Sequence, residues 1–171
     1  TGLRTGLALA KGLALGAGKP VLGISSLAVL AGNARDSQSP EPKLLAPIID
    51  ARHQEVFTAL FRQVDDSPLP KQISDILVLK PDFVMPALRA LDTDQRGILL
   101  VGPALGLLPP VTDGFSLGSA SPPDPLILAS QAAYSLVHDL SSDCPVTPLY
   151  GRSPDIFKKW VPPTRLACRE P

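Results

Sequence analysis

The sequence predicts an α/β fold in which helices flank a mixed β-sheet, and three observations support this. Residues 1–34 run from an apolar helix through a short apolar segment into a second helix, an order typical of an α/β layer. Residues 44–62 hold two apolar runs around a short polar link, which predicts a β-hairpin. Residues 97–102 form an apolar run bounded by glycines, typical of a buried parallel strand. The sheet should therefore contain both strand directions.

The first fifteen residues predict a helix, because leucine and alanine recur there and Gly16, Gly18 and Pro20 supply a stop. Small residues recur at every fourth position of this segment, namely Gly2, Gly6, Ala10 and Ala14. A helix that is apolar nearly all round is expected to be buried on several sides. Arg4 and Lys11 interrupt it, and it ends short of the roughly twenty residues that a membrane span needs. We therefore expect a buried helix of a soluble protein.

The next elements follow from local signals. Residues 20–25 are apolar and β-prone and predict a buried strand, after which Ser25 or Ser26 caps a helix over residues 27–34. The polar, proline-containing residues 35–42 are the candidate boundary between two lobes. Within the hairpin, Pro47 cannot donate to a ladder, so its strand should tolerate a gap there or lie at a sheet edge.

The second half of the chain should be built in the same way. Residues 73–79 resemble a strand, and Pro81 opens a helix with Val84, Leu88 and Leu91 on one face. The proline-rich residues 103–123 should form a loop with at most one short strand near Phe115. A last helix begins at Asp124 and Pro125, with an expected apolar stripe of Leu126, Ala129, Ala133, Leu136 or Val137, and Leu140. The remainder, from residue 145, should be extended over the surface.

Composition narrows the class of protein. The 171 residues are 44% hydrophobic and 19% charged with a formal net charge of zero. This composition excludes a disordered chain and gives no global attraction to nucleic acid or anionic lipid. The two cysteines, Cys144 and Cys168, have neither the spacing nor the histidine companions of a metal site. Two cysteines in a chain of this size indicate a reducing cytoplasm.

Motifs for catalysis are weak. Gly16–Lys19 resembles part of a phosphate loop, but the earlier glycine is Leu13 and Pro20 replaces the hydroxyl residue, so a helix C-cap is favoured. Residues 23–27 approach a nucleophile elbow without its final glycine. His53 at a hairpin tip and His138 near a helix end do not form a metal-binding pair. No catalytic residue and no metal ligand is predicted.

Two further groups of residues leave alternatives open. Asp50 ends an apolar strand, where α/β folds often place ligand chemistry, yet a pairing of Asp50 with Arg52, or of Arg52 with Glu55, that pins the hairpin is favoured. The tail interleaves aromatic residues with basic ones, which could contact RNA or could simply lie solvated on the surface. These tail residues are Tyr150, Arg152, Phe157, Lys158, Lys159, Trp160, Arg165 and Arg169.

Four motifs in order resemble the bacterial TsaB family. Residues 1–14 resemble its F-T-G-x-R-x-G-x-x-x-A-K-G-L-A segment, and Ile24–Leu27 its V-S-S/T-L. Residues 50–57 are similar to its D-A-R-x-x-E-V-Y, and residues 148–152 to its P-x-Y-x-R. The resemblance implies an actin-like (ASKHA, ribonuclease H-like) fold of two lobes. It implies residues 1–37 as the remnant of an incomplete first lobe, 38–146 as the second lobe and 147–171 as an extended tail.

The resemblance also implies a function. TsaB-like proteins are non-catalytic scaffolds or activators that pair with a catalytic TsaD-type paralogue and a TsaE-type ATPase in threonylcarbamoylation of a tRNA adenosine. ATP and a divalent metal are then used by the partner proteins, and this chain binds no cofactor itself and contacts tRNA only indirectly. The alternative is a glycoprotease-type hydrolase, in which Asp50 and His53 would have to serve.

The first helix corresponds, by this resemblance, to one that packs at the interface with the paralogue. The implied interface residues are Thr1, Gly2, Arg4, Gly6 and Ala10. Asp50 and Arg52 are the weaker candidates for a ligand or structural motif. The family's preceding Gly-Pro-Gly-Ser is absent, so we expect an incomplete chain whose exposed first helix drives self-association.

Overall fold

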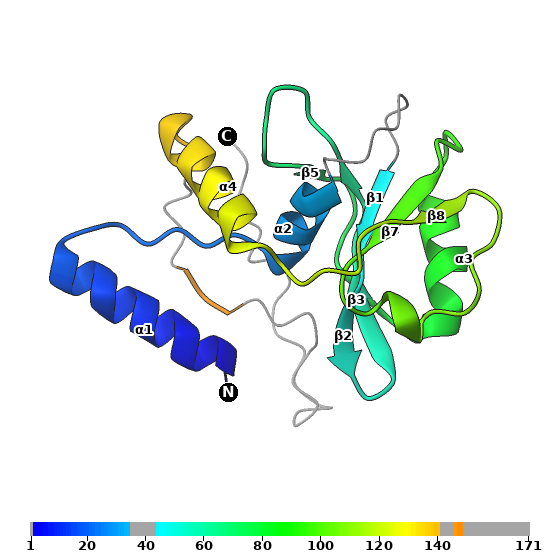
Figure 1. The fold of residues 1–171 in the computed structure, drawn as a ribbon, viewed down its shortest axis with the longest axis horizontal. Coiled ribbons are helices and arrows are strands. Elements are labelled where there is room, and N and C mark those ends of the chain that lie inside the picture. The colour runs from blue at the N-terminus through cyan, green and yellow to red at the C-terminus, as the bar shows by residue number, and fades with distance from the viewer. Residues whose placement is uncertain (1, 35–43, 141–145, 149–171) are drawn as a thin grey trace, which may run out of the picture.

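The computed structural model describes residues 2–34, 44–140 and 146–148, and Figure 1 shows their arrangement. The helices are α1 (Gly2–Ala17), α2 (Ser26–Asn33), α3 (Pro81–Leu91) and α4 (Pro125–Val137), with a short 3₁₀ helix, η2 (Leu105–Leu107). The strands are β1 (Leu44–Pro47), β2 (Ile49–Arg52), β3 (Glu55–Thr58), β4 (Phe61–Arg62), β5 (Lys71–Gln72), β6 (Leu77–Leu79), β7 (Ile98–Val101) and β8 (Phe115–Leu117).

A mixed five-stranded sheet with the order β5-β4-β1-β7-β8 forms the centre of the fold. Strand β7 is parallel to both β1 and β8, whereas β4 is antiparallel to β1 and to β5. A smaller antiparallel sheet has the order β2-β3-β6. The prediction of an α/β fold with both strand directions is confirmed.

Helices cover both faces of the larger sheet (Figure 1). One core cluster joins Val84 and Leu88 of α3 to Ile98 and Leu100 of β7. The other cluster joins α2 to the alternate residues of the same strands, including Leu45, Leu99 and Val101. Because successive strand residues point to opposite faces, a strand covered on both sides must be apolar throughout. This explains the uninterrupted apolar run of β7.

The predicted hairpin is confirmed, but its two arms are divided between the two sheets. Strands β1 and β4 pair in the larger sheet, and β2 and β3 pair in the smaller one. Pro47 lies in the central strand β1, so the expectation of an edge strand is wrong and the expectation of a gap is confirmed. Leu44 donates its N–H to the carbonyl of Gly97, just before β7, and Ile48 donates to Val101 of β7. Pro47 therefore faces β4, whose pairing with β1 ends at Leu45. The missing N–H of Pro47 therefore costs no ladder bond.

Several helix boundaries match the local signals. Ser25 accepts a hydrogen bond from the N–H of Leu27 at 3.3 Å, and Asp124 accepts one from Leu126 at 2.7 Å. Gly18 ends α1 with a φ of 62°, and Lys19 donates to the carbonyl of Ala14 at 2.9 Å. This is a Schellman C-cap, which needs a left-handed residue such as glycine. The helix-cap interpretation of Gly16–Lys19 is confirmed.

The prediction of a strand at residues 20–25 is wrong. The segment is extended but pairs with no strand of the described chain, and Val21, Leu22 and Ile24 are half-buried as it runs toward α2. An apolar β-prone run becomes a strand only where a neighbouring strand can satisfy its backbone groups. The run at residues 73–79 is also shorter than predicted. Its strand β6 begins at Leu77, because the Ser74 side chain accepts a bond from Leu60 N–H at 2.8 Å and turns the chain.

Two expectations about buried faces are corrected. On α3, Val84, Met85 and Leu88 are buried, but Leu91 is exposed at the last turn of the helix. On α4, every residue of the predicted stripe is exposed, and Gln131 and Ser135 are buried instead. The reason is the position of α2, which meets α4 on the opposite side of that helix from the stripe.

The contact between α2 and α4 depends on one glutamine. Gln131 is fully buried, and its Nε2 donates to the carbonyls of Ala28 at 3.1 Å and Pro68 at 3.2 Å. These two bonds offset the desolvation of the NH₂ group, whereas Oε1 of Gln131 is buried without a hydrogen-bond partner in the described chain. Gln131 therefore fixes which face of α4 turns inward.

The described residues include no helix long and apolar enough to cross a membrane. The predicted boundary between lobes at residue 37 lies outside the described residues, and so does the predicted tail at residues 147–171 except for residues 147 and 148. Both remain predictions.

Candidate partner-binding surface

Helix α1 is the main candidate, and its burial differs from the sequence prediction. None of its residues is buried, and Leu3, Leu9, Leu13 and Leu15 are all more than half exposed. Figure 1 shows α1 standing away from the sheet, joined to α2 by an extended segment. The expectation of a helix buried within its own fold is wrong, because no element of the described chain packs across its apolar surface. The helix still forms, since its backbone hydrogen bonds are satisfied internally.

The small residues of α1 give this surface its shape. A side-chain carbon added at Gly2, Gly6, Gly12 or Gly16 would meet nothing within 4 Å. No other element of the described chain therefore packs closely against these glycines. Gly2, Gly6 and Ala10 lie within about 80° of one another around the helix, so another backbone could approach along that side. Thr1, the first predicted interface residue, lies outside the described residues.

Asp50 and Arg52 form a pair that stabilises the β2–β3 hairpin. Asp50 Oδ1 accepts the backbone N–H of Arg52 at 2.7 Å, and Asp50 Oδ2 lies 3.4 Å from the Arg52 guanidinium. Arg52, His53 and Gln54 all have φ values between 53° and 63°. Consecutive non-glycine residues in this region are uncommon and need local support. The Asp50 side chain supplies it, so the hairpin-pinning interpretation is confirmed for Asp50 with Arg52.

The two histidines lie apart in the fold. His53 is at the tip of the β2–β3 hairpin, as predicted, while His138 caps the end of α4 and contacts the ring of Tyr134 with centroids 4.1 Å apart. Within residues 2–34, 44–140 and 146–148, no group of three or more histidine, cysteine, aspartate or glutamate side chains is placed to hold a metal ion.

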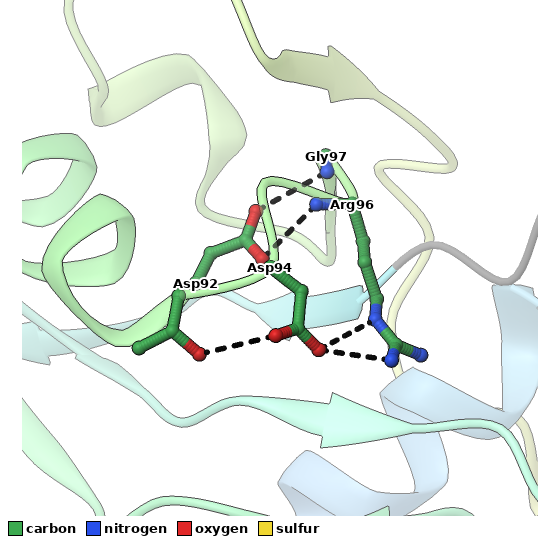
Figure 2. A network of polar contacts seen from close by, with 5 residues as sticks. Asp92, Asp94, Arg96 and Gly97 are labelled. Atoms are coloured by element: carbon green, nitrogen blue, oxygen red, sulfur yellow. Dashed lines mark hydrogen bonds and ion pairs between the residues drawn. The ribbon is translucent and has the colours of Figure 1, made fainter.

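A polar network at the end of α3, shown in Figure 2, supports the loop that leads into β7. The two carboxylate oxygens of Asp92 accept the backbone N–H groups of Arg96 at 3.1 Å and Gly97 at 3.2 Å. Asp94 instead binds the Arg96 side chain, with a shortest distance of 2.9 Å. Sequence reasoning missed this network, although an aspartate that directly follows a helix is a recognisable turn signal.

We expect Asp92→Ala to lower the free energy of unfolding by about 1–3 kcal/mol, because two backbone N–H groups would lose their acceptor. Asp94→Ala is the matched control in the same loop. Its partner Arg96 is well exposed, so its loss should cost under about 1 kcal/mol. Urea unfolding of both variants measures the difference, and equal losses would contradict this assignment.

Two solved structures have a fold similar to that of this chain. Among solved structures, the fold matches YeaZ from Pseudomonas aeruginosa with a TM-score of 0.65 and 24% identity, over 82% of this chain and 62% of that one. A second structure, described as an uncharacterised protein with similarity to peptidase YeaZ from Pseudomonas aeruginosa, matches with a TM-score of 0.68 over 88% of this chain and 68% of that one. The mixed-sheet α/β fold expected from the resemblance is thereby confirmed.

The sequence relatives are more specific. The tRNA threonylcarbamoyladenosine biosynthesis protein TsaB of Bacillus subtilis is 35% identical over 102 residues, which cover 60% of this chain. The protein of the same name from Escherichia coli is 38% identical over 84 residues, or 49% of this chain. A model of the family described as TsaD, tRNA N6-adenosine threonylcarbamoyltransferase, matches residues 1–75. Over the matched residues the chain is TsaB-like, and the resemblance carried by the four motifs is confirmed.

The matches cover part of each relative. The chain spans 41% of the length of the Bacillus subtilis protein and 35% of the Escherichia coli protein. The TsaD family model ends at residue 75 and so includes α1, α2 and the β2–β3 hairpin. The candidate surface on α1 and the Asp50–Arg52 pair both lie within this matched region.

Proposed function

We propose that this chain acts as a non-catalytic scaffold or activator subunit in the synthesis of threonylcarbamoyladenosine in tRNA, paired with a TsaD-type catalytic paralogue. Two relatives are named TsaB, and the first 75 residues match a family model described as TsaD, tRNA N6-adenosine threonylcarbamoyltransferase. The observation that carries the proposal is α1, whose apolar surface is left exposed by the described chain within that same region.

The contact with the paralogue would use the small-residue side of α1. Gly2, Gly6 and Ala10 allow a partner helix to approach closely. Arg4, the remaining predicted interface residue on α1, lies on nearly the opposite side of the helix from Gly2 and Gly6. Burial of exposed leucines against a partner would supply the main favourable term. The surface thus has the apolar centre and sparse charge typical of a stable protein interface.

The remaining parts of the machinery follow from the same assignment. A TsaE-type ATPase would be the third protein, with ATP and a divalent metal used by the partners and tRNA contacted indirectly. The process belongs in the cytoplasm. The role of this chain would be to hold the catalytic paralogue in its active form.

The test is reconstitution with purified components. Unmodified tRNA, the TsaD-type and TsaE-type proteins, ATP and a preformed activated threonylcarbamoyl donor are incubated with or without this chain, and the modified nucleoside is measured by mass spectrometry. We expect modification to depend on the chain. Gly6→Leu combined with Ala10→Leu should weaken binding of the paralogue at least tenfold, because larger side chains keep the partner helix away.

Gly12→Leu is the matched control, because Gly12 lies on another side of α1 and is equally open. It should leave binding of the paralogue within about twofold. Modification that proceeds equally well without the chain would contradict the proposal. Equal effects of the double variant and of Gly12→Leu on binding would show that the Gly6 and Ala10 side of α1 does not form the interface.

A glycoprotease-type hydrolase is the alternative, suggested by one structural neighbour, which is described as similar to a peptidase. It would require Asp50 and His53 to act in catalysis, but Asp50 uses its carboxylate to hold Arg52 in the hairpin. Cleavage of a glycoprotein by the purified chain, abolished by Asp50→Asn, would establish this alternative and refute the scaffold role.

A further inference from the structure

The chain contains a single aspartate–glycine step, Asp113–Gly114, and no asparagine–glycine step. In such a step the backbone nitrogen of the glycine can attack the aspartate side chain, because glycine carries no side chain that hinders the approach. Every other aspartate of the sequence is followed by a residue with a side chain. The covalent structure therefore favours this reaction at Asp113 over the other aspartates.

Asp113 and Gly114 form the centre of a turn that leads into the edge strand β8. Phe115 donates its backbone N–H to the carbonyl of Thr112 at 3.2 Å, and Gly114 has a φ of 85°. This combination is typical of a type II turn, in which glycine takes the position that requires a positive φ. Both central residues are exposed. The turn therefore presents the aspartate–glycine step to solvent.

The two reacting groups have no partner among the described residues. Gly114 donates its backbone N–H to none of them, and the Asp113 carboxylate makes no hydrogen bond or ion pair with them. The carboxylates of Asp50 and Asp92, by contrast, accept backbone N–H groups. Ring closure at Asp113 thus breaks no hydrogen bond made by either reacting group.

Two hydrogen bonds hold the peptide units of this turn in place. The guanidinium of Arg89 in α3 donates to the carbonyl of Asp113, and Cζ of Arg89 lies 5.4 Å from the centroid of the Phe115 ring. Ile98 of β7 donates its N–H to the carbonyl of Gly114 at 2.9 Å. Ring closure rotates the peptide unit that carries the Asp113 carbonyl, so Arg89 must release it first. Arg89 is exposed, and an exposed contact opens at a low cost in free energy.

We propose that Asp113 is a site of isoaspartate formation and that Arg89 limits its rate. The nitrogen of Gly114 bonds to Cγ of Asp113 and gives up its proton, and the carboxyl group loses an oxygen as water, which leaves a cyclic imide. Water then opens the imide. Cleavage between the nitrogen and Cγ restores aspartate, whereas cleavage between the nitrogen and the main-chain carbonyl carbon joins Gly114 through the Asp113 side chain. No oxidant or reductant takes part.

The product is a substrate for an isoaspartyl methyltransferase that uses S-adenosylmethionine. Isomerisation converts the former main-chain carbonyl of Asp113 into an exposed carboxylate. The enzyme transfers the sulfonium methyl group to an oxygen of that carboxylate, and S-adenosylhomocysteine leaves. Attack of the Gly114 nitrogen on the ester expels methanol and forms the imide again, so repeated cycles return the residue to aspartate.

Isomerisation should loosen β8, because it adds one carbon to the main chain at the turn and displaces the Gly114 carbonyl from Ile98. Strand β8 is at the sheet edge, so β1 and β7 keep their pairing. We expect faster hydrogen exchange at the Ile98 amide of the modified chain. The amide of Ile48, which donates to Val101 at the other end of β7, should exchange at an unchanged rate.

The test ages the purified chain at neutral pH and physiological temperature. Methyl transfer from labelled S-adenosylmethionine counts the isoaspartate, and loss of cleavage before residue 113 by an aspartate-specific endoproteinase locates it. We expect isoaspartate to accumulate at residue 113 and Arg89→Ala to accelerate this by at least about threefold, because the turn opens more often. Asp113→Glu should abolish the signal, since the longer side chain forms a larger ring that closes far more slowly.

Arg96→Ala is the matched control, because Arg96 is another exposed arginine whose side chain binds Asp94 rather than the turn. It should leave the rate unchanged. If circular dichroism shows that Arg89→Ala has lost its fold, the unmodified chain is aged in guanidinium chloride, where it should isomerise faster than the folded chain. Absence of isoaspartate from the aged chain, or an equal signal in Asp113→Glu, would overturn the site. Equal rates with and without the Arg89 side chain, or with and without the denaturant, would overturn the role of Arg89. None of these outcomes bears on the tRNA-modification assay.

Discussion

Gly102→Ala is expected to lower the free energy of unfolding by about 3–5 kcal/mol. Gly102 has a φ of 113°, a conformation that residues with a side chain rarely adopt. A side-chain carbon at this position would lie 2.7 Å from the carbonyl oxygen of Ile48 and 3.3 Å from its nitrogen. The obstacle is backbone rather than a flexible side chain, so the strain cannot be relieved by a rotamer change.

The surroundings of Gly102 explain why the backbone cannot yield. Ile48 donates its N–H to Val101 at 2.7 Å and accepts a bond from Ala104 at 3.3 Å, at the point where the chain leaves β1 for the smaller sheet. Gly102 itself donates to Ser119 at 2.8 Å. Displacing Ile48 would therefore disturb the ends of two central strands together.

Chemical denaturation of the variant measures this effect. Gly106→Ala is the matched control, because Gly106 lies in the following 3₁₀ helix and an added carbon there meets nothing within 4 Å. It should change the free energy of unfolding by less than about 1 kcal/mol. A loss below about 1 kcal/mol for Gly102→Ala would contradict the close approach of β1 and β7 at this point.

Gly32→Ala should lower the free energy of unfolding by about 2–4 kcal/mol by separating α2 from α4. An added carbon would lie 2.4 Å from Nε2 of Gln131 and 2.8 Å from Cγ2 of Ile127. Gln131 cannot move aside without losing its bonds to the carbonyls of Ala28 and Pro68. The cost thus combines overpacking with a buried amide that loses its partners.

A double-mutant cycle isolates this contact. In a Gln131→Ala background, Gly32→Ala should cost clearly less than in the unmodified chain, because the nearest obstacle has been removed. The expected coupling is about 1–2 kcal/mol and is measured by urea unfolding of the four proteins. Strict additivity would show that Gln131 does not set the distance between α2 and α4.

Gly12→Ala in α1 is the matched control for the helical glycine. Nothing lies within 4 Å of the added carbon, so the substitution should raise helix content through alanine's higher propensity, worth about 1 kcal/mol. Circular dichroism and the same unfolding curves give both quantities.

Local sequence signals predicted the caps of three helices and the burial of both faces of strand β7. Ser25, Gly18 and Asp124 act on backbone groups within a few residues, so their caps could be recognised before any tertiary contact was known. The run of β7 is apolar at every position, so both of its faces could be predicted as buried. The Asp50–Arg52 pair could also be predicted, because its two members are only two residues apart in the chain.

Long-range contacts determine which side of each helix is buried and which strands find partners. The apolar stripe of α4 is a valid local pattern, yet the helix turns inward through Gln131, whose partners lie 103 and 63 residues away. Residues 20–25 have the composition of a strand but no strand of the described chain to pair with, and α1 has the composition of a core helix but no residue buried by that part of the chain. Pro47 fits a central strand only because β4 stops pairing at Leu45. Local and long-range features differ in this way because the interactions behind them act over different distances along the chain. Caps and turns depend on hydrogen bonds that close within a few residues, whereas burial depends on surfaces that meet only after the whole chain has folded.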